Sequence, residues 1–201
     1  MIPIPAERPP EQERPCDPER PSDPERPPDR LTRTPLLAGA LAFAAAAHHG
    51  PRREGDTDIE HPIAVARLLD DAGFGEEVVA AALLHDVVED TRTAIAEIRA
   101  RFGEPVAGLV ATMTEDAAIA TYHERKAEHR RRIRDDGRGA AAIYAADKLA
   151  TARKLAGEDR RVPVARLAHF RRTLDELSRA KPELEFLEEL RAELDRLEPR
   201  R

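Results

Sequence analysis

The stretch "LLHDVVEDT", residues 83–91, places four polar side chains directly after an almost wholly apolar run. If this stretch is helical, Glu89 lies one turn beyond His85. By the same spacing Asp90 lies one turn beyond Asp86, while the two valines take the opposite side. Three neighbouring carboxylates repel one another, and their burial without compensation is costly. The stretch therefore predicts a bound cation or a hydrated pocket.

The length and composition of the chain restrict the class of protein. Its 201 residues, 41% of them hydrophobic, can bury one sizeable core. A net charge of -6 argues against a protein that coats nucleic-acid phosphates, but is compatible with a small anionic ligand. The single cysteine, Cys16, excludes an intrachain disulfide and suits a reducing cytosol. Because the longest apolar run, 36–47, is too short to span a bilayer, we expect a cytoplasmic protein with no nucleic-acid or membrane partner.

Residues 1–30 differ from the rest of the chain in composition. They hold 10 of the 17 prolines, and a hexapeptide repeat places an Arg-Pro pair after each of Glu7, Glu13, Glu19 and Glu25. Repeated proline blocks helix formation, and the segment has little apolar surface to bury. We predict a disordered or polyproline-II tail over 1–30, ahead of a single domain over 31–201. A solvated spacer is the favoured interpretation, and a docking segment for a proline-recognising partner is left open.

The domain is predicted to be all-α, because apolar residues recur at helical spacing and no stretch alternates over the length of a strand. With 3% aromatic residues, alanine and leucine must build the core between closely packed helices. Leucines over 174–197 could close this core or form a homodimer seam, and core closure is the favoured use. The basic stretch 129–136 is interpreted as a solvated helix face. The expected helices are 35–48, 62–72, 75–90, 92–102, 104–113, 117–135, 139–156, 162–180 and 183–197.

Two further residues extend the polar cluster through the predicted fold. His61 precedes His85 by 24 residues, an interval that fits a helix, a glycine turn and an antiparallel helix. Asp147 lies among small residues in "AADKLATARKL", where another backbone could approach closely. Two imidazoles and two carboxylates suit Mn²⁺, Fe²⁺, Mg²⁺ or Zn²⁺. Such an ion neutralises the carboxylates and lowers the pKa of a bound water, next to which Glu89 and Asp90 can handle protons.

The spaced series of histidines and aspartates resembles the HD superfamily of metal-dependent phosphohydrolases, which is named after an adjacent His-Asp pair. Over roughly residues 36–160 the chain more narrowly resembles the hydrolase domain of RelA/SpoT-type enzymes and their small single-domain relatives, through "HPIAVARLLDDAGFGEEVVAAALLHDVVEDT", "IRARFGEPVAGLV" and "AADKLATARKL". This resemblance implies an HD-domain helical bundle that removes the 3′-pyrophosphate of ppGpp and pppGpp, usually with Mn²⁺. It also implies two groups of residues, the metal ligands His61, His85, Asp86 and Asp147 and the water-activating pair Glu89 and Asp90.

The residues expected around the substrate depart in part from the family pattern. Arg52 and Arg53 lie in the loop before the first histidine ligand, where either could match the family arginine and contact phosphate. The Pro-Tyr pair usual after this loop is absent. Thr151 stands where the family has an asparagine near the substrate. Arg125 and Lys126 match a family Arg-Lys pair.

Two classes of function follow from these observations. One is an enzyme that hydrolyses a nucleotide, with ppGpp as the leading substrate and another nucleotide as the alternative. The other is a catalytically silent HD-like domain used for binding or regulation. The acidic pair favours the enzyme, because clustered carboxylates lower stability unless a metal is bound.

Overall fold

The computed structural model describes residues 30–49, 59–158 and 162–198, and within these ranges the chain is helical without a strand. The prediction of an all-α fold is confirmed. The expected proline-rich tail lies outside the described residues, apart from Arg30. In the described ranges no helix is long and apolar enough to cross a membrane. The elements are the 3-10 turn η1 Arg30–Thr32 and the helices α1 Pro35–His49, α2 Glu60–Asp71, α3 Glu76–Leu84, α4 Val87–Asp90, α5 Ile95–Met113, α6 Tyr122–Asp135, α7 Arg138–Gly157, α8 Val164–Ala180 and α9 Leu187–Leu197.

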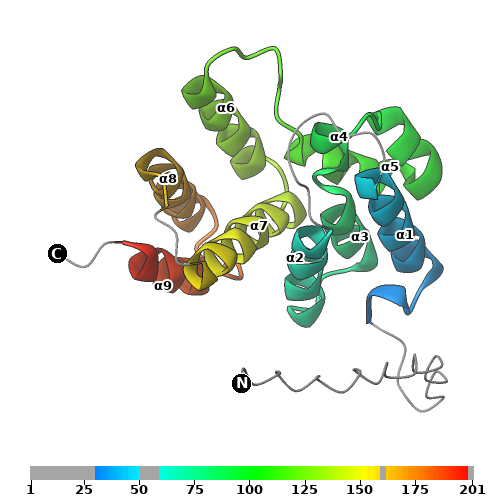
Figure 1. Cartoon of the computed structure of the whole chain (residues 1–201), viewed down its shortest axis with the longest axis horizontal. Helices are drawn as coiled ribbons and strands as arrows, with labels where there is room; N and C mark the ends of the chain where they lie inside the picture. The colour runs from blue at the N-terminus through cyan, green and yellow to red at the C-terminus, as the bar shows by residue number, and fades with distance from the viewer. Residues whose placement is uncertain (1–29, 50–58, 159–161, 199–201) are drawn as a thin grey trace, which may run out of the picture.

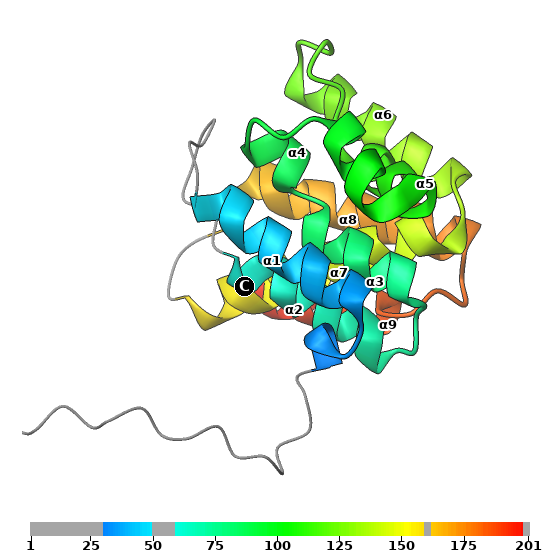
Figure 2. The ribbon, with the colours of Figure 1, turned by 90° about the vertical axis from the view of Figure 1, so that its right-hand side faces the viewer.

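Two helices form the centre of the fold. α3 buries residues 79–84, and α7 buries the alanine-rich stretch 140–147, as the low aromatic content predicts. Small residues permit close packing, since a Cβ on Gly139 would lie 3.2 Å from Val78 Cγ2. α1, α2 and α5 pack against α3, and α9 packs against α7. Figure 1 shows α7 between a group formed by α1 to α5 and a second group formed by α6, α8 and α9, and Figure 2 turns the side of α1 and α5 toward the viewer.

The C-terminal leucines close the core, which was their favoured use. Six of them are buried, namely Leu174, Leu177, Leu184, Leu187, Leu190 and Leu194. Because these side chains are covered within one chain, a homodimer would need another surface and stays a prediction.

The helix expected at 75–90 is divided in the structure. α3 ends at Leu84 and α4 begins at Val87, with His85 and Asp86 in the turn between them. Both turn residues keep right-handed helical backbone angles, so the helix is interrupted without a strained residue. The expectation of one continuous helix is therefore wrong, and the His-Asp pair lies at a helix junction.

The boundaries of α5 and α6 also differ from expectation. α5 contains the break expected between the helices at 92–102 and 104–113, because the φ of 83° and ψ of 172° at Gly103 are not helical, although its first helix begins at Ile95. The helix expected from residue 117 begins at Tyr122, where the Thr121 side chain caps the first turn.

The basic stretch 129–136 is only partly solvated. His129, Arg130 and Ile133 are buried, whereas Arg131 is exposed. The interpretation as a solvated face is therefore wrong for the inner side of α6, which carries polar groups into the molecule.

Candidate active site

The four residues expected to bind metal come together where α2, the α3–α4 turn and α7 meet. His61 Nε2 lies 3.1 Å from Asp147 Oδ1 and 3.9 Å from Asp86 Oδ2. His85 Nε2 lies 3.1 Å from Asp86 Oδ1, and the two imidazole centroids are 5.5 Å apart. One possible ligand atom from each of His61, His85 and Asp86 lies within 4.8 Å of the others. The cluster has the size and donor types of a metal site, and the role of its members as ligands stays a prediction.

The α3–α4 turn fixes the position of the proton on His85. Its Nδ1 lies 2.7 Å from the backbone oxygen of Ala82, and a carbonyl can only accept, so Nδ1 carries the hydrogen. In the neutral ring Nε2 then presents a lone pair, and this buried atom has no hydrogen-bond partner among the described residues. It faces Asp86 Oδ1, which is another acceptor. A cation between the lone pair of the neutral ring and this carboxylate oxygen is favourable, so the residues fit a divalent metal.

His61 reaches the cluster from the first turn of α2. This helix begins at Glu60, two residues before the expected start at Pro62. Burial lowers the pKa of His61, but the hydrogen bond to Asp147 and the charges of Asp147 and Asp86 raise it by more. The net rise reflects the negative charge gathered at this point, which would also attract a metal cation.

Lys148, a residue that the sequence analysis did not single out, accompanies Asp147 on α7. Its ammonium donates to Asp147 Oδ2 and lies 4.4 Å from the centroid of the Tyr144 ring. Burial raises the pKa of Asp147, yet Lys148 and His61 together hold it well below its usual range. Burial lowers the pKa of Lys148, and the charge of Asp147 raises it by more. Asp147 is therefore ionised and able to face a cation.

Glu89 and Asp90 lie on α4, just beyond the His-Asp turn. Glu89 accepts a hydrogen bond from the backbone N–H of Glu115. Burial raises the pKa of Glu89 to about 7, although the N–H of Glu115 opposes this shift. Burial and the charge of Asp86 raise the pKa of Asp90 to about 6. Both carboxyl groups can exchange a proton near neutral pH, and their catalytic role stays a prediction.

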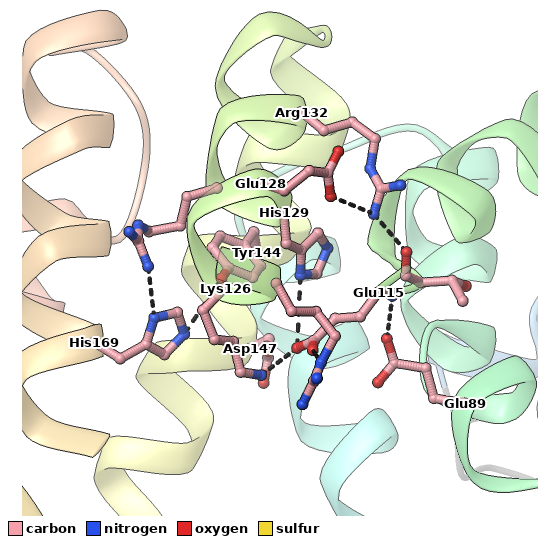
Figure 3. A network of polar contacts seen from close by, with 12 residues as sticks. Glu89, Glu115, Lys126, Glu128, His129, Arg132, Tyr144, Asp147 and His169 are labelled. Atoms are coloured by element: carbon pink, nitrogen blue, oxygen red, sulfur yellow. Dashed lines mark hydrogen bonds and ion pairs between the residues drawn. The ribbon is translucent and has the colours of Figure 1, made fainter. Parts of the chain in front are cut away.

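A second polar cluster surrounds Glu115, in the segment between α5 and α6 (Figure 3). Arg125 Nε donates to Glu115 Oε2 over 2.8 Å, Lys126 donates to Oε1, and His129 Nδ1 lies 3.8 Å from Oε1. Burial raises the pKa of Glu115, but Lys126 and Arg125 lower it by more. Arg125 also donates to the backbone oxygen of Ile119. The two cations expected to bind substrate are therefore partly neutralised by a carboxylate of the chain itself.

A cavity of about 260 Å³ connects the two clusters. Its wall includes the predicted residues His85, Asp86, Glu89, Lys126, Asp147 and Thr151. Thr151 Oγ1 donates to Asp147 Oδ1 over 3.4 Å. His61, Asp90 and Arg125 do not appear in the wall among the described residues, and Arg52 and Arg53 lie outside the described part of the chain.

Several residues of the cavity wall were not predicted from the sequence, namely Met113, Glu115, Tyr122, His129, Tyr144, Lys148, Arg166, His169 and Phe170. Helical spacing could have indicated Tyr144, which precedes Asp147 by three residues on α7 and so shares its face. No local signal marks Arg166 or His169, because α8 reaches the cavity only through tertiary packing.

The comparison with known families defines the class of protein. The chain belongs to the HD domain family, whose model matches residues 40–185. The matched range contains the four clustered residues and the whole cavity wall. The resemblance recognised in the sequence is therefore confirmed.

Individual relatives show which members of this family the chain resembles. Over 124 residues the chain is 42% identical to mouse MESH1, a guanosine-3′,5′-bis(diphosphate) 3′-pyrophosphohydrolase, in a match that covers 59% of this chain and 69% of the relative. A probable enzyme of the same name from Synechocystis is 40% identical over 149 residues, which are 71% of this chain and 17% of the relative. The solved structure of a protein described as a metazoan ortholog of SpoT that hydrolyzes ppGpp has a TM-score of 0.67 and 29% identity, and the match covers 82% of this chain and 94% of that chain. The chain thus spans most of the small relatives and a minor part of the long one.

Proposed function

We propose that this protein is a metal-dependent phosphohydrolase that removes the 3′-pyrophosphate of ppGpp or pppGpp. The observation that carries the chemistry is the buried lone pair of His85 Nε2, which faces Asp86 beside His61 and Asp147. The substrate class is supported by relatives that are named as 3′-pyrophosphohydrolases and by the solved structure of the relative described as hydrolyzing ppGpp. The geometry and the relatives are independent grounds for the same reaction type.

We assign the metal to His61, His85, Asp86 and Asp147, with Mn²⁺ as the proposed ion because imidazole and carboxylate donors suit it and the family resemblance favours it. When bound, the ion would supply a water of lowered pKa beside the substrate. Lys148 keeps Asp147 ionised, and the Ala82 carbonyl keeps the Nε2 lone pair of His85 turned toward the cluster.

The remaining roles belong to side chains around the cavity. Glu89 is assigned to accept and return a proton, because it lines the cavity and its pKa lies at about 7. Asp90, on the same short helix as Glu89, is assigned to assist this proton transfer. Lys126, Lys148 and Arg166 supply positive charge for a polyphosphate anion. We place Thr151 near the substrate and retain Arg125, Arg52 and Arg53 as proposed phosphate contacts.

A nucleotide panel tests this function. Mn²⁺-loaded protein is incubated with ppGpp, GTP, dGTP and GMP, and released pyrophosphate and orthophosphate are measured separately. We expect pyrophosphate from ppGpp with the highest kcat/KM, and a further gain for ppGpp in Thr151→Asn, which restores the family amide. Loss of activity in His85→Ala and its retention in His123→Ala, an exposed histidine on α6, would tie hydrolysis to the cluster.

The panel also separates the alternatives. Equal kcat/KM for all nucleotides, with no gain in Thr151→Asn, would refute the alarmone assignment and leave a phosphohydrolase for another nucleotide. Absence of both metal and hydrolysis would favour a silent HD-like domain. In that case, capture of partners with and without residues 1–30 would test the proposed docking role of the tail. A homodimer and a cytoplasmic location remain part of the proposal.

A further inference from the structure

A buried chain of polar side chains links α8, α6 and α7 behind the cavity. Arg130 Nε donates to Glu176 Oε1 over 3.0 Å, and a terminal nitrogen of Arg130 lies 3.0 Å from His169 Nδ1. The other ring nitrogen, Nε2, lies 3.4 Å from the Tyr144 hydroxyl. Figure 3 shows a dashed contact at each of the two ring nitrogens of His169. Arg130, His169 and Tyr144 are all buried, and the last two lie in the cavity wall.

The chemistry of arginine determines which group donates and which accepts in this series of buried contacts. A guanidinium has only donors, so Nδ1 of His169 must accept from Arg130. A neutral imidazole that accepts at Nδ1 carries its hydrogen on Nε2. Burial and the positive charges of Lys148, Lys126 and Arg130 lower the pKa of His169 to about 3, so the ring is neutral. Arg130 therefore selects one tautomer of a neutral histidine.

The Nε2–H of His169 makes only a long hydrogen bond within the protein. A distance of 3.4 Å to the Tyr144 oxygen is long for an N–H···O hydrogen bond, which is usually about 2.7–3.2 Å. His169 shares the cavity wall with Arg166 and Lys126, whose charges attract anions. A phosphate oxygen, which carries no hydrogen when ionised, is a stronger acceptor for this N–H than the distant Tyr144 hydroxyl.

We propose that Arg130 is a positioning residue that holds His169 with Nε2–H available to a phosphate oxygen of the substrate. The identity of the substrate that supplies this phosphate rests on the proposed function, whereas the tautomer of His169 does not depend on it. Glu176 orients Arg130, and Arg130 acts on the substrate only through His169.

Nitrogen NMR of the histidine rings in the full chain tests the tautomer. We expect His169 of the wild type to show the Nε2–H form across about pH 5 to 8. Arg130→Met removes the donor and should give a mixture of tautomers, while Arg130→Lys, which keeps a donor, should retain the Nε2–H form. Arg131→Met, the exposed neighbour on the same helix, is the control and should change nothing. An Nδ1–H form in the wild type, or an unchanged tautomer in a folded Arg130→Met, would overturn the proposal.

Kinetics of the metal-loaded protein with ppGpp tests the contact with substrate. His169→Leu should raise KM by about 3- to 10-fold, the range for one lost neutral hydrogen bond, with kcat nearly unchanged. His169→Gln places an amide donor near the position of Nε2 and should recover most of the loss. Because Arg130 acts through His169, the double variant Arg130→Met/His169→Leu should be no worse than His169→Leu. A wild-type KM in His169→Leu, or additive losses in the double variant, would contradict this mechanism. If Arg130→Met does not fold, the tautomer of His169 in the wild type and the two His169 variants still decide the outcome.

Inorganic pyrophosphate separates this proposal from the proposed function. If no nucleotide is hydrolysed, the function fails, but addition of pyrophosphate to the metal-loaded chain should still shift the His169 Nε2 resonance in the wild type and in Arg131→Met. No shift at His169, with pyrophosphate bound, would refute the contact even if ppGpp is hydrolysed.

Discussion

At the scale of single residues, Glu89 experiences opposing influences. Burial and the charges of Glu115 and Asp86 favour its protonated form, whereas the N–H of Glu115 and the ammonium of Lys126 favour the carboxylate. The balance places its pKa at about 7, which suits a group that must both accept and release a proton near neutrality.

We expect Glu89→Gln and Asp90→Asn to bind metal as the wild type does but to turn over about 100-fold more slowly, because a proton-handling group is typically worth at least that factor. Elemental analysis and steady-state kinetics measure the two effects. Glu104→Gln, on a largely exposed side chain, is the matched control. Wild-type turnover in both active-site variants would show that neither residue handles the proton.

The same pKa predicts how the stability of the metal-free protein depends on pH. The carboxyl of Glu89 titrates near 4.5 when unperturbed and near 7 when folded, so between these values the folded state holds more protons than the unfolded state. The free energy of unfolding should therefore fall as pH rises through this window, by up to about 3 kcal/mol from this group. Asp90, with a raised pKa, adds a change of the same sign.

Urea unfolding in the presence of a chelator, at several pH values, measures this dependence. Glu89→Gln cannot titrate, so its stability should fall less steeply than that of the wild type. An equally steep fall in the variant would show that other groups cause the dependence.

Single residues also show what the sequence could and could not predict. His85, Asp86 and Asp147 could be predicted from the sequence, because polar and charged side chains are unusual within apolar helices. Lys148 follows Asp147 directly, but its burial depends on Tyr144 and on packing that no local pattern reveals. His169 is similar, since its importance comes from an arginine 39 residues away.

At the scale of elements, helical periodicity predicted which segments are helical but not where the α3–α4 turn interrupts them. The interruption falls at His85 and Asp86, which keep helical backbone angles. Since neither residue is a proline or a glycine, the sequence carries no local signal for a break at this point. The break near Gly103 was predicted because glycine is the usual residue at such angles. Local chemistry therefore marks one interruption and tertiary packing creates the other.

Two glycines of α5 provide a test of this reasoning. Gly103, at φ 83° and ψ 172°, occupies a region that only glycine adopts readily, so Gly103→Ala should lower the free energy of unfolding by about 1–3 kcal/mol. Gly108 lies in the helical part of α5, is exposed, and has open space at the position of a Cβ. Gly108→Ala should therefore raise the free energy of unfolding by up to about 1 kcal/mol. Chemical denaturation measures both, and changes of the same sign would contradict the assigned backbone angles.

At the scale of the whole molecule, the metal cluster joins segments that are distant in sequence. His61 comes from α2, His85 and Asp86 from the α3–α4 turn, and Asp147 from α7. The sequence predicted these residues as one set, and the family resemblance supplied the set more securely than spacing alone. An ion held by all three segments would bind the folded chain and not the unfolded one, so binding should stabilise the entire helical domain.

Chelation should therefore lower the Tm of metal-loaded protein. With metal at about 100 times its Kd, binding contributes about 2.7 kcal/mol. In a domain of this size that corresponds to about 5–10 °C. The shift should vanish in His85→Ala, because the lone pair that faces Asp86 is lost, and persist in His123→Ala. Deletion of residues 1–29 should leave the shift intact, since none of the four clustered residues lies there. A shift of wild-type size in His85→Ala, measured by thermal melting with and without chelator, would place the stabilising ion elsewhere in the protein.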